Sequence, residues 1–164
     1  MQIRPERPHD IAAIHALTRD AFANAPHRDG TEQDVVDALR AAGALSVSLV
    51  AEDGDALVGH FALSPVTLSD GSEGWYGLGP ISVAPAQQGR GVGSALMRAA
   101  LAALRERGAA GCVLLGDPAY YARFGSRADS RLRLPGVPAE YFQAVLLRGE
   151  WPEAEVQYHG AFGG

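Results

Sequence analysis

The sequence contains no lysine and a single cysteine, and each shortage excludes a kind of site. All 14 basic residues are arginine, so a Walker A loop, which requires Gly-Lys-Ser/Thr, is excluded. The one cysteine, Cys112, excludes an internal disulfide and both common zinc-binding spacings. We therefore expect neither a disulfide nor a metal site of these kinds.

Long apolar runs and basic stretches are also missing. No segment approaches the roughly 18 apolar residues that a membrane span needs, and the opening MQIRPERPHD lacks the apolar core of a signal peptide. The net charge is −5, with no basic stripe to meet a phosphate backbone. These absences predict a cytoplasmic protein whose partners are neither membranes nor nucleic acid.

The patterns that are present predict one α/β domain over residues 1–164, built around a mixed, mainly antiparallel sheet. Strands are expected at residues 2–4, 45–51, 56–66, 74–84, 112–115, 141–147 and 156–162. Helices are expected at residues 8–22, 31–43 and 94–107, with a short one from 118 to about 125. Asp-Gly pairs at 53–54 and 70–71 predict hairpin turns.

The most informative stretch is ISVAPAQQGRGVGS, from Ile81 to Ser94. It reads as the end of a strand, a turn with glycines at 89, 91 and 93, and the start of an alanine-rich helix. Glycine permits positive φ and close approach of the backbone to a ligand, and a helix N-terminus presents unpaired N–H donors with partial positive charge. The stretch is therefore a candidate pyrophosphate cradle, to which Arg90 could add a charge. A dinucleotide fingerprint does not fit, since its last position falls on Ser94 or Leu96.

This stretch resembles motif A of the GNAT superfamily of acyl-CoA N-acetyltransferases, Arg/Gln-x-x-Gly-x-Gly/Ala, here Gln88-x-x-Gly91-x-Gly93. A second segment, GDPAYYARFG at residues 116–125, resembles the motif B region, in which Tyr-x-x-x-Gly-Phe follows the fifth strand. The order of predicted elements matches that fold along essentially the whole chain. The resemblance implies a GNAT fold of about seven strands and four helices, with the fourth strand splayed from the fifth.

The resemblance also implies an activity. It implies transfer of an acetyl group from the co-substrate acetyl-CoA to a primary amine of a small molecule or peptide, by direct attack and without a metal. The alternative is a non-catalytic acyl-CoA-binding or regulatory module of the same fold. Self-association as a homodimer, and the use of acyl groups other than acetyl, stay open.

The residues that match motif A are expected to bind coenzyme A. The resemblance implies that backbone N–H groups hold its pyrophosphate, supplied by Gln88, Gly89, Arg90, Gly91, Val92, Gly93 and Ser94. It also places Ile81, Ser82 and Val83 on the strand that pairs with the pantetheine arm. The amide of Ile81 would point at the acetyl carbonyl, where oxyanion charge develops. A β-bulge is expected just before it, in the run 77–80.

Tyr121 aligns with the tyrosine that many relatives use as general acid. A phenol with an ordinary pKa near 10 can donate a proton to a departing thiolate. Its neighbour Tyr120 reads as an ordinary half-buried aromatic, and Asp117 reads as the cap of the short helix.

Two positions depart from the family pattern. Ser126 stands where the family usually has phenylalanine, which removes an aromatic core contact. Gly77 stands where some relatives carry a glutamate that acts as the general base. Glu73, His60 and a chain of water molecules are the remaining candidates for that role.

Overall fold

The computed structural model describes residues 1–23 and 30–163, and within them it contains two sheets and four α-helices. The strands are β1 (Gln2–Pro5), β2 (Val47–Asp53), β3 (Ala56–Pro65), β4 (Thr67–Leu68), β5 (Trp75–Val83), β6 (Gly111–Leu115), β7 (Leu132–Arg133), β8 (Phe142–Leu146) and β9 (Ala154–Gln157). The α-helices are α1 (Ile11–Phe22), α2 (Glu32–Ala41), α3 (Val92–Glu106) and α4 (Pro118–Tyr121), and a 3₁₀ turn, η5 (Gly160–Phe162), lies near the C-terminus.

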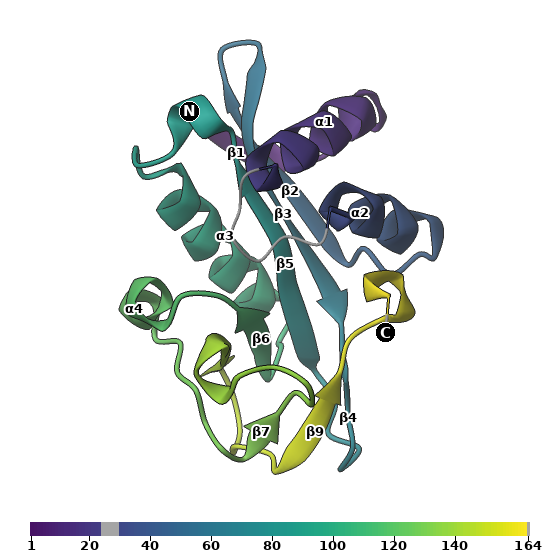
Figure 1. Ribbon diagram of the computed structural model, residues 1–164, viewed down its shortest axis with the longest axis vertical. Helices are drawn as coiled ribbons and strands as arrows, with labels where there is room; N and C mark the ends of the chain where they lie inside the picture. Colours follow the sequence, from purple (N-terminus) through teal and green to yellow (C-terminus); the bar gives the residue numbers. More distant parts are fainter. Residues whose placement is uncertain (24–29, 164) are drawn as a thin grey trace.

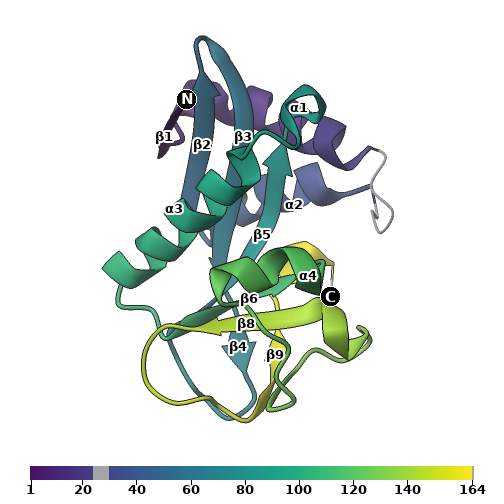
Figure 2. The same cartoon turned by 90° about the vertical axis from the view of Figure 1, so that its left-hand side faces the viewer.

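The larger sheet has the strand order β1-β2-β3-β5-β6-β8. Every neighbouring pair is antiparallel except β5 and β6, which run parallel. Helix α3 covers one face of this sheet, and α1 and α2 cover the other (Figures 1 and 2). This arrangement confirms the predicted α/β class with a mixed, mainly antiparallel sheet.

Helix α3 is held to the sheet by an apolar face with helical spacing. Leu96, Met97, Ala100 and Leu104 are fully buried and belong to the same core cluster as Phe61 of β3. Burial of each large side chain of this kind stabilises a fold by roughly 1.5–3 kcal/mol. The packing fixes the N-terminus of α3 beside the end of β5.

Strands β5 and β6 pair along only part of their length. Their register joins Trp75–Gly77 to Gly111–Val113, whereas β5 continues to Val83. A register shift between Phe61 and Leu63 of β3 lies opposite residues 78–81 and confirms the predicted bulge. β5 and β6 are the fourth and fifth strands of the expected pattern, and beyond Gly77 they separate.

A smaller sheet, β4-β9-β7, packs against one end of the larger one (Figure 1). Together they form a second core cluster, which includes Trp75, Val113 and Phe142 from the larger sheet and Leu68, Leu132 and Val156 from the smaller one. The two-residue strands β4 and β7 were not expected, because two residues carry no readable alternation.

Several predicted boundaries are wrong. The strand expected at 45–51 is β2 at Val47–Asp53, and the helix expected at 8–22 becomes α-helical only at Ile11. The strand expected at 156–162 ends at Gln157, since Nδ1 of His159 accepts a hydrogen bond from the N–H of Ala161 at 3.0 Å and caps a turn instead. The helix expected from Ser94 begins two residues earlier, at Val92. In the described part of the chain, no helix is both long and apolar enough to span a membrane.

Candidate active site

The predicted cradle lies at the N-terminus of α3. Gly89 and Gly91 adopt positive φ angles of 79° and 84°, as the turn requires, and residues 88–91 are exposed. Ala95 donates its N–H to the carbonyl of Gly91 at 3.1 Å. The amides of residues 92–94 precede that bond and have no acceptor one helical turn back, so they are open to a ligand. The side chain of Arg90 lies at the exposed rim of this turn.

Gly93 does not have positive φ, and its smallness serves close packing instead. A Cβ at this position would lie 3.1 Å from the hydroxyl oxygen of Tyr120. That hydroxyl is 3.4 Å from Oγ of Ser94, within hydrogen-bonding range. Tyr120, read from the sequence as an ordinary aromatic, therefore brings a hydroxyl to the first turn of α3, which no sequence spacing could show.

The end of β5 offers backbone groups to the gap beside β6. The N–H of Ala84 donates to the carbonyl of Val58 at 2.8 Å, and Ser82 lies opposite His60 of β3. Because backbone groups alternate in direction along a strand, those of Ile81 and Val83 point away from β3. The carbonyl of Val83 accepts a hydrogen bond from Nε2 of Gln88 at 3.2 Å, which ties the cradle to the strand.

Ser82 differs from its two neighbours. It pairs with β3, and its side chain is buried on the face covered by α1, so it does not face the gap. The prediction that it lies along the pantetheine arm with Ile81 and Val83 therefore does not match its placement, because the alternation of the strand turns it away.

The side chains considered as general base lie outside the pocket described below. Glu73 is exposed in the turn before β5. His60 is fully buried, and its Nε2 is 2.8 Å from Oγ of Ser48, which in turn hydrogen-bonds Glu6. Burial lowers the pKa of His60 to about 4, so the ring is neutral at neutral pH. It is a structural part of the sheet core.

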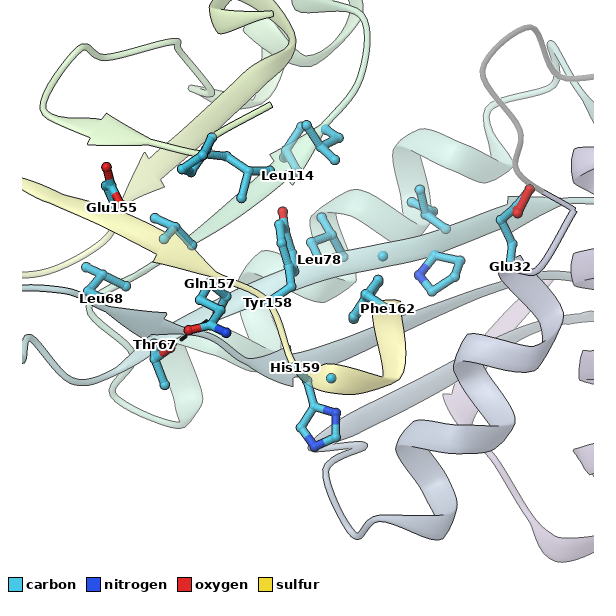
Figure 3. Close-up of a pocket in the computed structure, with 18 of the residues that line it drawn as sticks. Glu32, Thr67, Leu68, Leu78, Leu114, Glu155, Gln157, Tyr158, His159 and Phe162 are labelled. Carbon is cyan, nitrogen blue, oxygen red and sulfur yellow. Dashed lines mark hydrogen bonds between the residues drawn. The ribbon is translucent and has the colours of Figure 1, made fainter. Parts of the chain in front are cut away.

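A cavity of about 890 Å³ opens where β5 and β6 separate. Its apolar wall includes Leu78 and Ile81 of β5 and Leu114 of β6, and its far end reaches α1, α2 and η5 (Figure 3). The charged side chains in its described lining are two carboxylates, Glu32 and Glu155, which lie at opposite ends of the cavity (Figure 3).

Tyr121 lines this cavity from α4. The helix begins as expected, with the carboxylate of Asp117 accepting the N–H of Ala119 at 2.9 Å. The Tyr121 ring lies directly against the position that a Cβ on Gly116 would take, so the glycine leaves room for it. Burial, with a smaller effect of Tyr120, raises the pKa of Tyr121 to about 12, so the phenol stays protonated.

Position 126, which departs from the family pattern, is buried and polar. The hydroxyl of Ser126 donates to Oε1 of Gln143 at 3.2 Å, and Nε2 of Gln143 donates to the carbonyl of Gly116 at 2.9 Å. This pair of bonds connects β8 to the segment that carries Tyr121, so a polar link replaces the aromatic contact.

Gly77, the other departure, is covered by an aromatic ring that the sequence analysis did not single out. A Cβ at position 77 would lie 2.6 Å from Cε1 of Tyr158, so no larger side chain fits there with the ring in place. A glycine inside a strand signals close approach by another group, but it does not identify that group. Tyr158 also lines the cavity (Figure 3).

The site thus combines a helix N-terminus, a strand edge that no described strand pairs with and a cavity lined by two tyrosines, the features of an acyl-CoA-dependent transferase. Residues 2–127 match the family described as acetyltransferase (GNAT) domain, and the chain belongs to this family.

Known proteins with similar sequences and folds agree with this assignment. The chain is 36% identical over 146 residues to the uncharacterized N-acetyltransferase YhbS of Escherichia coli K12, covering 86% of this chain and 84% of YhbS. A GNAT family acetyltransferase from Brucella melitensis, solved in complex with acetyl-CoA, is 48% identical with a TM-score of 0.88, over 98% of this chain and 97% of that one. The Escherichia coli YhbS structure, solved with CoA, is 34% identical with a TM-score of 0.89, over 99% and 92%.

Proposed function

We propose that this protein transfers an acetyl group from acetyl-CoA to a primary amine. The observation that carries the proposal is the continuity of the site. The open amides at the start of α3 and the unpaired edge of β5 lead into the cavity that Tyr121 lines. The two similar proteins solved with acetyl-CoA and with CoA support the same choice of donor.

In this mechanism the backbone amides of residues 89–94 and the partial positive charge of the helix N-terminus hold the diphosphate of the donor. The N–H of Gln88, also predicted to take part, donates instead to the carbonyl of Pro85 at 3.5 Å. The amide of Ile81 donates to the thioester carbonyl oxygen, on which negative charge develops during attack. The amine nitrogen forms the new C–N bond with its lone pair. The C–S bond then breaks, and its electron pair leaves on sulfur.

Two protons move in this reaction. Tyr121 donates to the sulfur as the thiolate forms; a cysteine-like thiolate has an ordinary pKa of about 8.5. With its own pKa raised to about 12, Tyr121 is protonated throughout the neutral range, and hydrogen bonding to the growing negative charge precedes full transfer. The amine proton passes to water in the cavity, since neither Glu73 nor His60 lines it. Water returns a proton to the Tyr121 phenolate, so the reaction leaves free thiol and the enzyme in its starting state.

The acceptor is proposed to be a primary amine that carries a second, cationic group, because the cavity carries Glu32 and Glu155 at its two ends. A matched pair of substrates tests this. We expect 1,6-diaminohexane to be acetylated several-fold faster than 6-aminohexanoate, which has the same reach but ends in a carboxylate. Glu155→Gln should reduce that preference, and an unchanged preference would contradict the role of Glu155.

The proposed activity is tested by following thiol release from acetyl-CoA with a panel of primary amines, and by the mass of the acetylated products. Titration calorimetry on the same protein measures the binding of acetyl-CoA. Binding without turnover on any amine would favour the non-catalytic acyl-CoA-binding module. The absence of binding would refute any role of the α3 cradle in holding the donor.

A further inference from the structure

Tyr158 is a partly buried tyrosine that the mechanism above does not use. It follows β9 directly, and its ring lies over the backbone of β5 at Gly77. On another side it packs against Phe162 of η5, with ring centroids 5.1 Å apart at an interplanar angle of 48°. The ring is therefore held in place by a strand backbone and a second ring, and its hydroxyl has a defined position.

That hydroxyl points into the cavity. Figure 3 shows it directed away from β9, toward the side on which Leu78 and Leu114 lie. Among the described residues, no hydrogen-bond partner for it is found within the protein. Burial and the nearby Cys112 thiol raise the pKa of Tyr158 above its ordinary value, so the group is a neutral phenol that can both accept and donate one hydrogen bond.

Tyr158 reaches the gap between β5 and β6 from the face opposite to Tyr121. Tyr76 and Leu78 belong to the core on the α3 face of the sheet, and Tyr121 packs against the same core. Gly77 lies between them in the strand and so faces the other way, where Tyr158 covers it. The cavity on this second face continues to Phe22 and Phe162.

We propose that Tyr158 binds and orients the acceptor amine. The amine enters the cavity from the face of the sheet that α1 and α2 cover. This inference rests on the proposed acetyltransferase function. The phenol oxygen of Tyr158 accepts a hydrogen bond from one N–H of the neutral amine, which directs the nitrogen lone pair at the thioester carbon. The bonds formed and broken are those given above, and Tyr158 neither gains nor loses a proton.

The test is Tyr158→Phe, which keeps the ring over Gly77 and removes only the hydroxyl. With the best amine of the panel, we expect kcat/KM for the amine to fall about fivefold to tenfold, while KM for acetyl-CoA stays within about twofold. Tyr76→Phe removes a hydroxyl from the other face of the same strand, outside the cavity lining, and should leave both values unchanged.

A second variant moves the ring without removing its hydroxyl. Gly77→Ala places a methyl group against the Tyr158 ring, so kcat/KM for the amine should fall at least as far as in Tyr158→Phe. The double variant should lose little more than Gly77→Ala alone, because both changes act on one contact.

The outcomes separate the two proposals. A wild-type protein that binds acetyl-CoA but acetylates no amine overturns the proposed activity and this inference with it. An active wild type whose Tyr158→Phe variant keeps its amine kcat/KM overturns the role of Tyr158 alone. The role of Tyr158 is also overturned if Tyr158→Phe raises the KM for acetyl-CoA as much as it raises the KM for the amine.

Discussion

At the scale of single residues, Tyr121 is the side chain on which the chemistry depends most. Tyr121→Phe keeps the ring beside Gly116 and removes the proposed proton donor. General acids typically contribute on the order of 10²–10⁴-fold, and the raised pKa places our expectation at about 10²-fold in kcat. The dissociation constant for acetyl-CoA, measured by calorimetry, should change little. A variant with unchanged kcat would remove Tyr121 from the mechanism.

His60 gives a second prediction at this scale, about stability instead of catalysis. Its pKa is about 4 in the folded protein and about 6.5 unfolded, so below pH 6.5 the unfolded chain takes up a proton that the native state does not. This contribution to stability is present above pH 6.5 and is lost as the pH falls toward 4. The free energy of unfolding in urea should decrease by up to about 3 kcal/mol over that range.

His60→Gln is the control, because a glutamine can still reach Ser48 but does not titrate. It should show a flatter dependence of stability on pH between 6.5 and 4. The dependence of activity on pH should be the same as in wild type, since His60 does not line the cavity. A changed pH profile of activity would return His60 to the candidates for general base.

At the scale of elements, the glycines at the start of α3 have separate tasks. Gly91 is the cap residue with φ of 84°, a conformation that costs an L-residue roughly 1–2 kcal/mol. Gly93 is helical, where alanine gains about 1 kcal/mol over glycine, offset by its approach to the Tyr120 hydroxyl. Gly91→Ala should therefore lower stability and Gly93→Ala should not.

The affinity for acetyl-CoA tests whether the turn at Gly93 binds the donor or is only the start of a helix. Gly93→Ala places a methyl group beside the amides proposed to hold the diphosphate, so we expect its dissociation constant for acetyl-CoA to rise on the order of tenfold at unchanged stability. Thermal unfolding and calorimetry on the same samples measure both effects. Equal affinity in wild type and Gly93→Ala would argue against a diphosphate at this turn.

Elements whose own residues show a helix, strand or turn pattern could be predicted from the sequence. Elements that depend on contacts with distant parts of the chain could not. The segment 81–94 contains the glycines, the strand and the helix that its structure needs, so the predicted cradle matches the observed turn. Strands β4 and β7 exist only because β9 lies between them. The contact of Tyr158 with Gly77 joins positions 81 residues apart, and the sequence shows only that something must cover a glycine.

At the scale of the whole molecule, the two sheets share one core. Trp75, Val113 and Phe142 of the larger sheet pack with Leu68 and Val156 of the smaller one. The cavity also crosses this boundary, because β5, β6 and β9 all contribute to its lining. Because the site needs both sheets in place, we expect the chain to fold as one cooperative unit. This is the behaviour that the prediction of a single domain requires.

The positions of the two tryptophans make that prediction testable without any substitution. Trp75 and Trp151 are 6.5 Å apart between ring centroids and both belong to the core shared with the smaller sheet, so their fluorescence reports on that end of the molecule. Far-UV circular dichroism is dominated by helices, and α1, α2 and α3 all pack on the larger sheet (Figure 1). If the chain is one domain, the urea transitions followed by the two signals should coincide, and saturating acetyl-CoA should move both to higher urea by the same amount. Separate midpoints, or a shift confined to one signal, would mean that the smaller sheet unfolds independently of the sheet that binds the donor.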